Sequence, residues 1–220
     1  PPPAPPDRVE PLAGTPRPAL PATVRSADGR ALTVRRAERV VPLSGSLSEI
    51  VFTLGLGSRV VARDVTAPFE QAARLPVVTR GHDVSAEGVL SLRPDRGIAE
   101  SSTGPAEAMD QIRAAGIPVL VVAAATGLDD VGPRSGAVAA ARGVPAAGEE
   151  LTRRTEERIA AVTRSVPRDG TKPRVAFLYL RGSASVYLIG GRGSGATSLI
   201  EAAGAGGPRP PGRRGEGGPP

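Results

Sequence analysis

The sequence predicts an α/β protein with one complete lobe, one long helix and the beginning of a second lobe. Three observations support this fold class. Apolar, strand-like runs alternate with well-punctuated helical segments over residues 22–145, which is typical of a parallel sheet covered by helices. A long amphipathic segment follows over residues 146–166. The strand–helix alternation then starts again over residues 172–206 and stops there, so we expect the second lobe to be incomplete.

The first elements of the complete lobe are a hairpin, a strand and a helix. Residues 22–34 hold two β-prone runs around an Asp-Gly pair, which favours a tight hairpin turn. The apolar run at residues 39–44 predicts a buried strand. Ser46 and Glu49 have the spacing of a capping box and predict the start of a helix, which ends at one of two following glycines.

The rest of this lobe continues the alternation. Residues 59–63 predict another strand, and residues 85–92 predict a short helix that a proline closes. Residues 104–116 predict a helix with a proline near its first turn and a glycine at its end. The wholly apolar run at residues 117–124 is typical of a strand in a parallel sheet. A strand is also expected within residues 93–101, although this stretch has few apolar residues.

The segment 146–166 predicts one long helix. One face is apolar or small and the opposite face is charged, as in an amphipathic helix. The residues of the first face are Leu151, Thr155, Ile159, Val162 and Val166. About 20 residues that rise about 1.5 Å each form a rod ~30 Å long. Beyond it, residues 174–181 and 185–191 predict strands, and residues 194–204 predict a helix.

The two ends of the chain have a different composition from the middle. Proline and glycine, 24 and 28 residues in all, are concentrated in residues 1–21 and 207–220. These segments show no apolar periodicity, so burial cannot offset the entropy of ordering them, and we expect both to be disordered. A proline-rich tether ahead of the first lobe fits a secreted or lipid-anchored protein.

Charge and composition exclude several classes of function. The formal net charge is +6, but residues 40–206 carry only +1 of it, and no basic stripe interleaves with aromatic residues. Nucleic-acid binding is therefore not favoured. The absence of cysteine excludes disulfides and thiolate metal sites. No apolar run reaches the ~18 residues that a membrane-spanning helix needs.

Three residues stand out as candidate ligands. His82 is the only histidine of the chain, and it precedes the short helix predicted at residues 85–92. Tyr179 and Arg181 lie two positions apart on a predicted strand, so they face the same side. An arginine beside a phenol favours the ionised phenolate, which is a suitable ligand for ferric iron. The alternatives are a solvated loop histidine and a tyrosine at the edge of the core with an extended arginine.

Two further patterns, one for nucleotide binding and one for a hydrolase, lack part of their sequence motifs. The glycine-rich stretch at residues 190–198 is similar to a phosphate loop, but it lacks the Gly-Lys-Ser/Thr ending. A hydrolase that uses His82 as a base remains an alternative, although no serine motif of the G-x-S-x-G type accompanies the histidine.

Several stretches, taken together, resemble one family. They are "RVVPLSGSLSEIVFTLGLGSRVVARD", "LPVVTRGHDVSAEGVLSLRPD", "IRAAGIPVLVV" and "RVAFLYLRGSASVYLIGGRGSGATSLIEAAG". In order and spacing, residues 22–206 are similar to the HmuT-like heme-binding lipoproteins of bacterial ABC importers. The most specific parts are "GHDVSAEGVLSL" and "FLYLRG". The resemblance implies a solute-binding protein with two α/β lobes joined by a single long helix.

The resemblance also implies roles for five residues. His82 and Tyr179 match the two axial ligands of the heme iron, and Arg181 matches the arginine that is hydrogen-bonded to the tyrosine. Glu49 and Glu201 match the glutamates, one on each lobe, that dock on arginine pockets of the permease.

The resemblance implies that the protein is a carrier without enzymatic activity. It would bind heme in the cleft between the lobes and deliver it to an ABC permease for iron uptake. It would lie outside the cytoplasm, with a lipid anchor in full-length relatives. A siderophore or cobalamin binder of the same fold is the alternative, and it needs no His–Tyr pair. Members of the family continue well past residue 206, so we expect a truncated second lobe.

Overall fold

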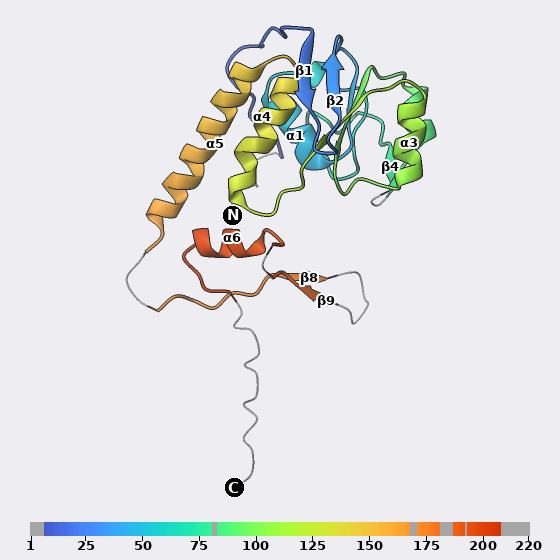
Figure 1. The fold of residues 1–220 in the computed structure, drawn as a ribbon. Coiled ribbons are helices and arrows are strands. Elements are labelled where there is room, and N and C mark those ends of the chain that lie inside the picture. The colour runs from blue at the N-terminus through green and yellow to red at the C-terminus, as the bar shows by residue number, and fades with distance from the viewer. Residues whose placement is uncertain (1–6, 81–82, 168–170, 181–186, 192, 208–220) are drawn as a thin grey trace. The chain divides into compact units, whose positions relative to one another are not determined.

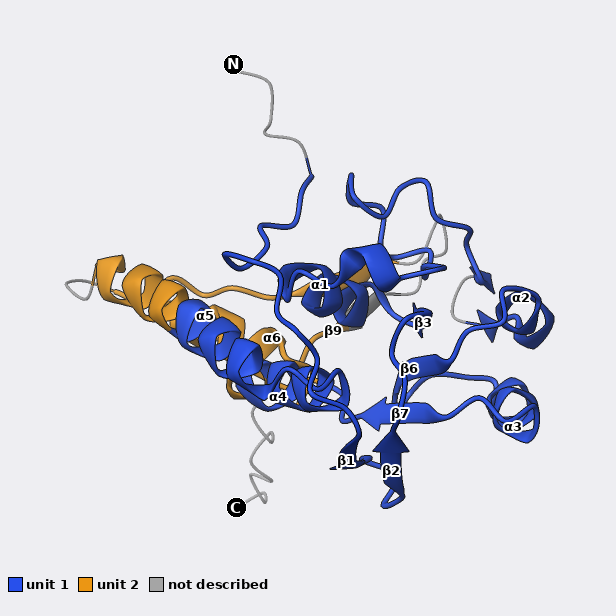
Figure 2. Cartoon of the chain, turned by 90° about the horizontal axis from the view of Figure 1, so that it is seen from above, with its two compact units in different colours: residues 1–124, 131–156 blue, residues 125–130, 157–220 orange. Residues whose placement is uncertain are grey.

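A computed structural model provides the structure of the chain. It describes residues 7–80, 83–167, 171–180, 187–191 and 193–207. The chain divides into two compact units, which Figure 2 shows in different colours. Unit 1 comprises residues 1–124 and 131–156, and unit 2 comprises residues 125–130 and 157–220. In the part of the chain that is described, no helix combines the length and the apolar character needed to cross a membrane.

A three-stranded parallel sheet forms the centre of unit 1. Its order is β3 (Val40–Pro42), β6 (Arg96–Glu100) and β7 (Val119–Val122). The sequence predicted all three strands, including the one expected within residues 93–101. The register places Gly97 opposite both Val41 and Val119.

The central strand β6 needs few apolar residues because neighbours cover it on every side. Ile98 packs into one cluster of buried residues and Ala99 into another. A Cβ atom added to Gly97 would lie 3.3 Å from Cγ2 of Val119, which is tighter than ordinary contact. A short strand with small residues therefore fits this crowded position, and a longer apolar run is not required.

Helices cover both faces of the sheet, so unit 1 has three layers (Figure 2). On one face lie α1 (Gly45–Thr53) and α4 (Val131–Ala141), which pack against Val40, Ile98 and Leu120. On the other face lie α2 (Ala86–Ser91) and α3 (Ala106–Ala114), which pack against Val41, Ala99 and Val119. The predictions of α2 and α3 are confirmed, and each begins within two residues of the predicted start.

The predicted hairpin at residues 22–34 is confirmed. Strands β1 (Ala22–Arg25) and β2 (Ala31–Val34) pair in antiparallel register. The turn between them is attached to the main sheet, because the Val121 amide donates to Ser26 Oγ at 2.8 Å. The hairpin is thereby fixed at the β7 edge of the sheet.

Helix α1 begins differently from the prediction. The N-cap is Ser44, whose Oγ accepts a hydrogen bond from the Leu47 amide at 3.3 Å. The capping box predicted for Ser46 and Glu49 is therefore wrong. The helix starts two residues earlier because β3 ends at Pro42, which leaves Ser44 in extended backbone at the strand-to-helix turn.

The strand predicted at residues 59–63 is also wrong. This segment starts with a 3-10 turn, Gly57–Arg59, and then makes only single bridges, from Val60 to Val40 and from Arg63 to Val77. Val60 alone bridges to β3, so the segment lies at the edge of the sheet without adding a strand to it.

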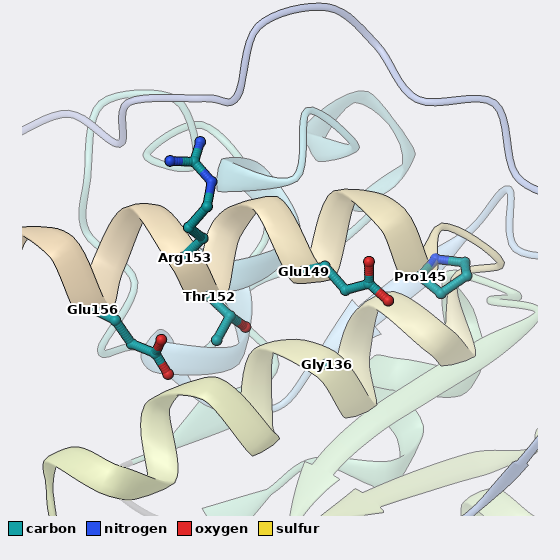
Figure 3. A pocket seen from close by; sticks show the side chains of 7 residues that line it. Gly136, Pro145, Glu149, Thr152, Arg153 and Glu156 are labelled. Atoms are coloured by element: carbon teal, nitrogen blue, oxygen red, sulfur yellow. The ribbon is translucent and has the colours of Figure 1, made fainter.

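Helix α5 (Pro145–Ser165) confirms the predicted long helix, and its residues up to 156 belong to unit 1. Glycines bring α4 and α5 close together, because a Cβ on Gly148 would lie 2.5 Å from that of Ala139. A surface groove of about 420 Å³ lies at this crossing. Figure 3 shows the side chains that line it. The groove is lined by Gly136, Pro145, Gly148, Glu149, Thr152, Arg153 and Glu156.

Residues 7–21, here called the N-terminal arm, differ from the expected disorder of residues 1–21. Val9 is buried in the core of unit 1. The Leu12 amide donates to the Thr53 carbonyl at 2.7 Å, and the Ala19 amide donates to the Gly143 carbonyl at 2.8 Å. The arm has no internal periodicity, but it packs on a lobe that other segments have built. Residues 1–6 and the tail at residues 208–220 lie outside the described residues.

Unit 2 contains the elements predicted beyond the long helix, each in a shorter form. Strands β8 (Leu178–Leu180) and β9 (Tyr187–Ile189) form an antiparallel pair, and α6 (Ala196–Ala202) follows. The end of α5 belongs to this unit. Figure 1 shows the pair of strands and α6 along the chain after α5.

Candidate functional site

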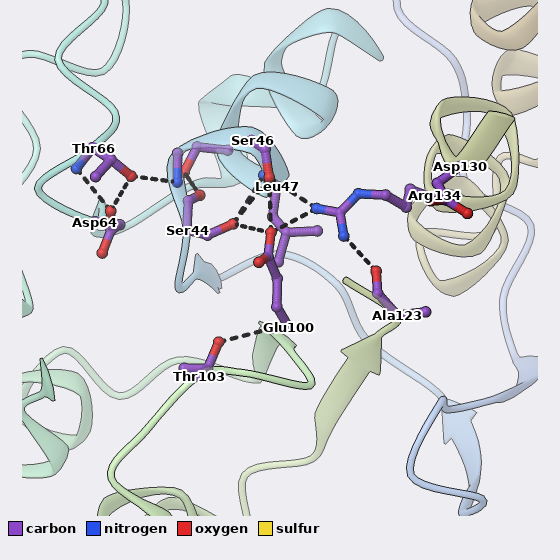
Figure 4. Close-up of polar contacts among 12 residues, drawn as sticks. Ser44, Ser46, Leu47, Asp64, Thr66, Glu100, Thr103, Ala123, Asp130 and Arg134 are labelled. Carbon is purple, nitrogen blue, oxygen red and sulfur yellow. Dashed lines mark hydrogen bonds and ion pairs between the residues drawn. The ribbon is translucent and has the colours of Figure 1, made fainter. Parts of the chain in front are cut away.

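A cluster of polar side chains occupies the carboxyl ends of the parallel strands in unit 1 (Figure 4). Glu100 is the last residue of β6, Ser44 and Ser46 follow β3, and Arg134 comes from α4. We call these four residues the Glu100 cluster. In open α/β sheets, ligands bind outside the carboxyl ends of the strands, so this edge is a candidate ligand-binding surface.

One carboxylate oxygen organises the Glu100 cluster. Glu100 Oε1 accepts hydrogen bonds from Arg134 Nη2 at 2.6 Å, from Ser46 Oγ at 2.9 Å and from Ser44 Oγ at 3.0 Å. Arg134 Nη2 also donates to Ser46 Oγ at 2.9 Å. The Arg134 side chain is 7% exposed and the Glu100 side chain 20% exposed, so water screens this ion pair only weakly.

The contacts of the Glu100 cluster fix the charge of its carboxylate. Burial alone would raise the pKa of Glu100, but the hydrogen bonds from Arg134, Ser46 and Ser44 outweigh it and lower the pKa below its ordinary value. Glu100 is therefore ionised at neutral pH, and Arg134 balances its charge.

Arg134 also links the third strand to the Glu100 cluster. Its Nη1 atom donates to the carbonyl of Ala123, the residue directly after β7. A single guanidinium therefore joins the carboxyl ends of β3, β6 and β7. This arrangement holds the candidate surface rigid.

A small hairpin lies against the same edge of the sheet. Strands β4 (Thr79–Arg80) and β5 (Asp83–Val84) pair in antiparallel register. The Val84 amide donates at 2.9 Å to the carbonyl of Gly104, in the turn that follows β6. The turn itself is held by the Glu100 amide, which donates to Thr103 Oγ1 at 2.9 Å. The β4–β5 hairpin is thus attached to the candidate surface.

Two of the three predicted ligands, His82 and Arg181, lie outside the described residues. For His82, the flanking residues Arg80 and Asp83 are described and lie opposite each other in the β4–β5 pair. Tyr179 is described. It lies in β8, opposite Leu188, and is 52% exposed. The pairing of these residues around one ligand stays a prediction.

The two predicted docking glutamates are both exposed. Glu49 lies on α1 in unit 1, away from the cap at Ser44. Glu201 lies on α6 in unit 2 and lines a surface pocket with residues that include Val166 and Gly204. Exposure leaves both carboxylates available for contact with a partner, and their role stays a prediction.

Sequence reasoning did not find the Glu100 cluster. Ser44 and Glu100 lie 56 positions apart, and Arg134 lies in a helix that was not predicted. The available signal was a polar residue at or near the end of each of two buried strands, Glu100 as the last residue of β6 and Ser44 two residues after β3. Among the described residues, no group of three or more His, Cys, Asp or Glu side chains could hold a metal ion.

The fold and the polar edge together define a class of protein. A three-layer α/β unit with polar groups at the carboxyl ends of parallel strands, followed by a long helix and a second α/β unit, is typical of a solute-binding protein. A family model described as periplasmic binding protein matches residues 40–210. The chain belongs to this family.

Solved structures with the same fold include two heme-binding proteins. The heme binding protein HmuT is 34% identical, with a TM-score of 0.81, over 91% of this chain and 66% of that chain. The periplasmic heme-binding protein RhuT from Roseiflexus sp. RS-1 is 40% identical, with a TM-score of 0.72, over 77% of this chain and 65% of that chain. These matches confirm the predicted α/β architecture of a two-lobed binding protein.

A curated relative has a different ligand in its name. The vitamin B12-binding protein of Yersinia pestis (strain Pestoides F) is 35% identical over 89 residues, which are 40% of this chain and 32% of that protein. The chain therefore spans about a third of the length of this relative and just under two thirds of the solved chains.

Proposed function

We propose that the protein binds heme between its two lobes and delivers it to an ABC permease for iron uptake. The family and its relatives are binding proteins rather than enzymes, and the family is periplasmic, which fits an extracytoplasmic carrier. A lipid anchor in the full-length protein is part of the proposal. A hydrolase that uses His82 finds no support among these relatives.

The observation that carries the proposal is the similarity to HmuT, a heme binding protein that matches 91% of this chain with 34% identity. Solved variants of HmuT have one histidine, one arginine or one tyrosine replaced by alanine, and the tyrosine and arginine lie two positions apart. Tyr179 and Arg181 have the same spacing here, and Tyr179 is half exposed on β8. An exposed phenol with an arginine two residues further along the sequence suits a ligand for ferric iron.

The proposed division of roles gives one axial ligand to each lobe. His82 offers an imidazole nitrogen, and its β4–β5 hairpin is attached to the carboxyl edge of the sheet. Tyr179 offers a phenolate oxygen. The guanidinium of Arg181 favours that anion through a charge-assisted contact. Ligation from both sides would hold the iron without any covalent attachment of the heme.

Hemin titration with matched tyrosine variants tests the proposal. The chain has two tyrosines, so Tyr187→Phe is the control for Tyr179→Phe. We expect Tyr179→Phe to lose the phenolate-to-iron charge-transfer band, and Tyr187→Phe to retain it. An unchanged spectrum in Tyr179→Phe would show that this residue is not a ligand of the iron.

Arg181→Ala separates the role of the arginine from that of the tyrosine. We expect weaker hemin retention, since the phenolate ligand loses a charge-assisted contact. Hemin retention that is the same in Arg181→Ala and in the unaltered protein would show that Arg181 does not act on the ligand.

Cobalamin is the second candidate ligand, because a curated relative is named for vitamin B12. A cobalamin site needs neither His82 nor Tyr179 as an iron ligand. Calorimetric titration with hemin and with cyanocobalamin distinguishes the two. Cobalamin binding that persists in His82→Ala and Tyr179→Phe, with no hemin binding in the unaltered protein, would replace the heme proposal by this one.

We further propose that Glu49 and Glu201 dock on the permease, one from each lobe. Both are exposed, on α1 and on α6. The binding protein is expected to stimulate ATP hydrolysis by the transporter. This stimulation should fall in Glu49→Gln and stay unchanged in Glu107→Gln, which changes an exposed carboxylate on α3. Residues 1–220 by themselves should not support import, because the lobe that carries Glu201 has little core.

A further inference from the structure

Three arginines gather at the amino edge of the parallel sheet of unit 1, which is the edge opposite the Glu100 cluster. Arg96 is the first residue of β6, Arg142 directly follows α4, and Arg59 ends a 3-10 turn. Two of them donate to adjacent carbonyls of one segment, Arg96 Nη2 to Arg36 and Arg59 Nη1 to Ala37, each at 3.4 Å. We call Arg59, Arg96 and Arg142 the arginine cluster.

Two members of the arginine cluster are removed from water without enough acceptors. Arg142 is 0% exposed and Arg96 is 2% exposed. The Nε, Nη1 and Nη2 atoms of Arg142, and the Nε and Nη1 atoms of Arg96, have no hydrogen-bond partner among the described residues. Buried charges in proteins are normally paired, and buried donors are normally satisfied. These guanidinium groups therefore call for an acceptor that the neighbouring side chains do not provide.

The carboxylates of this region make their hydrogen bonds elsewhere. Glu38 has a side chain that is 66% exposed, and its Oε1 atom lies 2.7 Å from Arg59 Nη1. Asp95 Oδ2 accepts from the amides of Glu38 and Arg39, at 2.7 and 3.0 Å. Asp95 Oδ1 is buried and has no hydrogen-bond partner, so it does not accept from the two buried guanidinium groups either.

The charges around Arg142 leave one positive charge without compensation. The groups whose charges act on Arg142 are Arg59, Arg96, Glu38 and Asp95. Burial, with a smaller effect from Arg59, lowers the pKa of Arg142 to about 10, so the group is still ionised at neutral pH. Three cations against two carboxylates leave a net positive charge of one. A monovalent anion balances this charge, whereas a divalent oxyanion such as sulfate would reverse it.

We propose that the arginine cluster is a binding site for a chloride ion, which accepts hydrogen bonds from Arg96 and Arg142. A spherical anion accepts N–H donors from any direction, so it suits guanidinium groups that come from two different elements. Carboxylates and phosphates, in contrast, favour the planar fork of a single arginine. Arg59, whose side chain is 24% exposed, is the member of the arginine cluster that reaches solvent.

The ion would join α4 to the amino edge of the sheet. At the opposite edge, Arg134 of the same helix already joins α4 to β6 through Glu100. The two contacts together would fix both ends of α4 on the sheet. The site lies wholly within unit 1, so its test is independent of heme.

Thermal unfolding in two salts tests this inference. The 220-residue chain is melted in sodium chloride and in sodium gluconate at equal ionic strength, because gluconate is too large for a buried site. We expect the melting temperature to be about 2–4 °C higher in chloride, since an ion that binds only the folded state stabilises it. The chloride NMR line should also broaden when the protein is added.

Arginine variants separate the site from a general effect of salt. Arg142→Met removes three of the unsatisfied nitrogens and should melt at the same temperature in both salts, without line broadening. Arg96→Met should reduce the chloride effect and serves if Arg142→Met does not fold. Arg25→Met changes an exposed arginine of β1 and should keep the full effect.

Two outcomes would overturn the inference. The first is an unaltered protein that melts at the same temperature in both salts and leaves the chloride line unchanged, which would assign the guanidinium groups to water alone. The second is a chloride effect of the same size in Arg142→Met and Arg96→Met, which would place the bound ion elsewhere.

Discussion

The two units contain the same kinds of elements but differ in their cores. Unit 1 buries two clusters of hydrophobic residues, one on each face of the β3–β6–β7 sheet. In the described part of unit 2, the buried hydrophobic residues are Ala196, Ile200 and Ala205. The difference shows that strands and helices follow from local pattern, whereas a core requires layers on both faces of a sheet.

The units also differ in the charges that they bury. Unit 1 holds Arg142 fully buried, and Arg142 has no hydrogen-bond partner for its guanidinium among the described residues. Burial, with a smaller effect from Arg59, lowers the pKa of Arg142 to about 10. A unit that tolerates such a buried charge must have stability to spare from its apolar clusters.

Hydrogen exchange should show the largest difference between unit 1 and unit 2. We expect amides of β7 to exchange only through global opening of unit 1, and amides of α6 to exchange through local opening at almost no cost. The two sets should differ in protection by about a thousandfold or more. Equal protection of residues 119–122 and 196–202 would show that unit 2 is as well packed as unit 1.

Two leucine substitutions, one in each unit, should show the next largest difference, in the unfolding free energy that each one costs. Leu120→Ala leaves a cavity in the core of unit 1 and should cost about 2–5 kcal/mol of unfolding free energy. Leu199→Ala removes a side chain that is 55% exposed and should cost less than about 0.5 kcal/mol. Urea unfolding measures both, and similar costs would contradict the comparison.

Glu100→Gln tests the polar edge of unit 1. Loss of the charge leaves Arg134 buried without its counter-ion and should cost about 1–3 kcal/mol at pH 7. The pKa of Glu100 in the folded state lies below its ordinary value of 4.5. Its contribution is therefore complete above that value and is lost as the pH falls through the folded-state pKa.

The control for Glu100→Gln is Glu107→Gln, which changes an exposed carboxylate on α3. This control should shift stability by less than about 0.5 kcal/mol. Unfolding curves of the three proteins at pH 7 and at acidic pH measure the contrast. A Glu100→Gln deficit that is unchanged at acidic pH would rule out the ion pair as its cause.

Arg142→Met should have the smallest effect and the opposite sign. Replacement of an unpaired buried charge by an apolar side chain of similar length should raise the unfolding free energy by about 1–2 kcal/mol at pH 7. The folded state holds the Arg142 proton less tightly than the unfolded state does. The gain should therefore be constant below pH 10 and shrink as the pH rises above it. Thermal melts at pH 7 and at pH 10.5 measure this, and a lower melting temperature at pH 7 would contradict it.

Local signals in the sequence were enough to predict most of the strands and helices of unit 1. The apolar run of β7, the hairpin pattern of β1 and β2, and the proline and glycine around α3 each act within a few residues. Helix α4 was missed because Gly132, Pro133 and Gly136 are typical of a loop. Gly132 is favourable there because it faces α5, where a Cβ atom would lie 2.9 Å from Cγ2 of Thr152.

The candidate site was less accessible to sequence reasoning. The Glu100 cluster depends on contacts between residues far apart in the chain, and no local pattern encodes them. The cap of α1 illustrates this, because Ser44 is both the N-cap and a donor to Glu100. The residue pattern singled out His82 and Arg181, and the family resemblance gave them their places at a heme iron, but both residues lie outside the described structure.

The N-terminal arm has a consequence for the order in which unit 1 is made. The arm is synthesised before the rest of unit 1, but its partners include the Gly143 carbonyl and Arg154, whose guanidinium donates to the Glu10 carbonyl at 2.9 Å. At about 5–20 residues per second, the arm waits on the order of ten seconds for these partners to emerge. Val9 stays in contact with water, or with a chaperone, during that interval. Completion of unit 1 is therefore a late step, in which the residues of the unit that are made earliest are among the last to be placed.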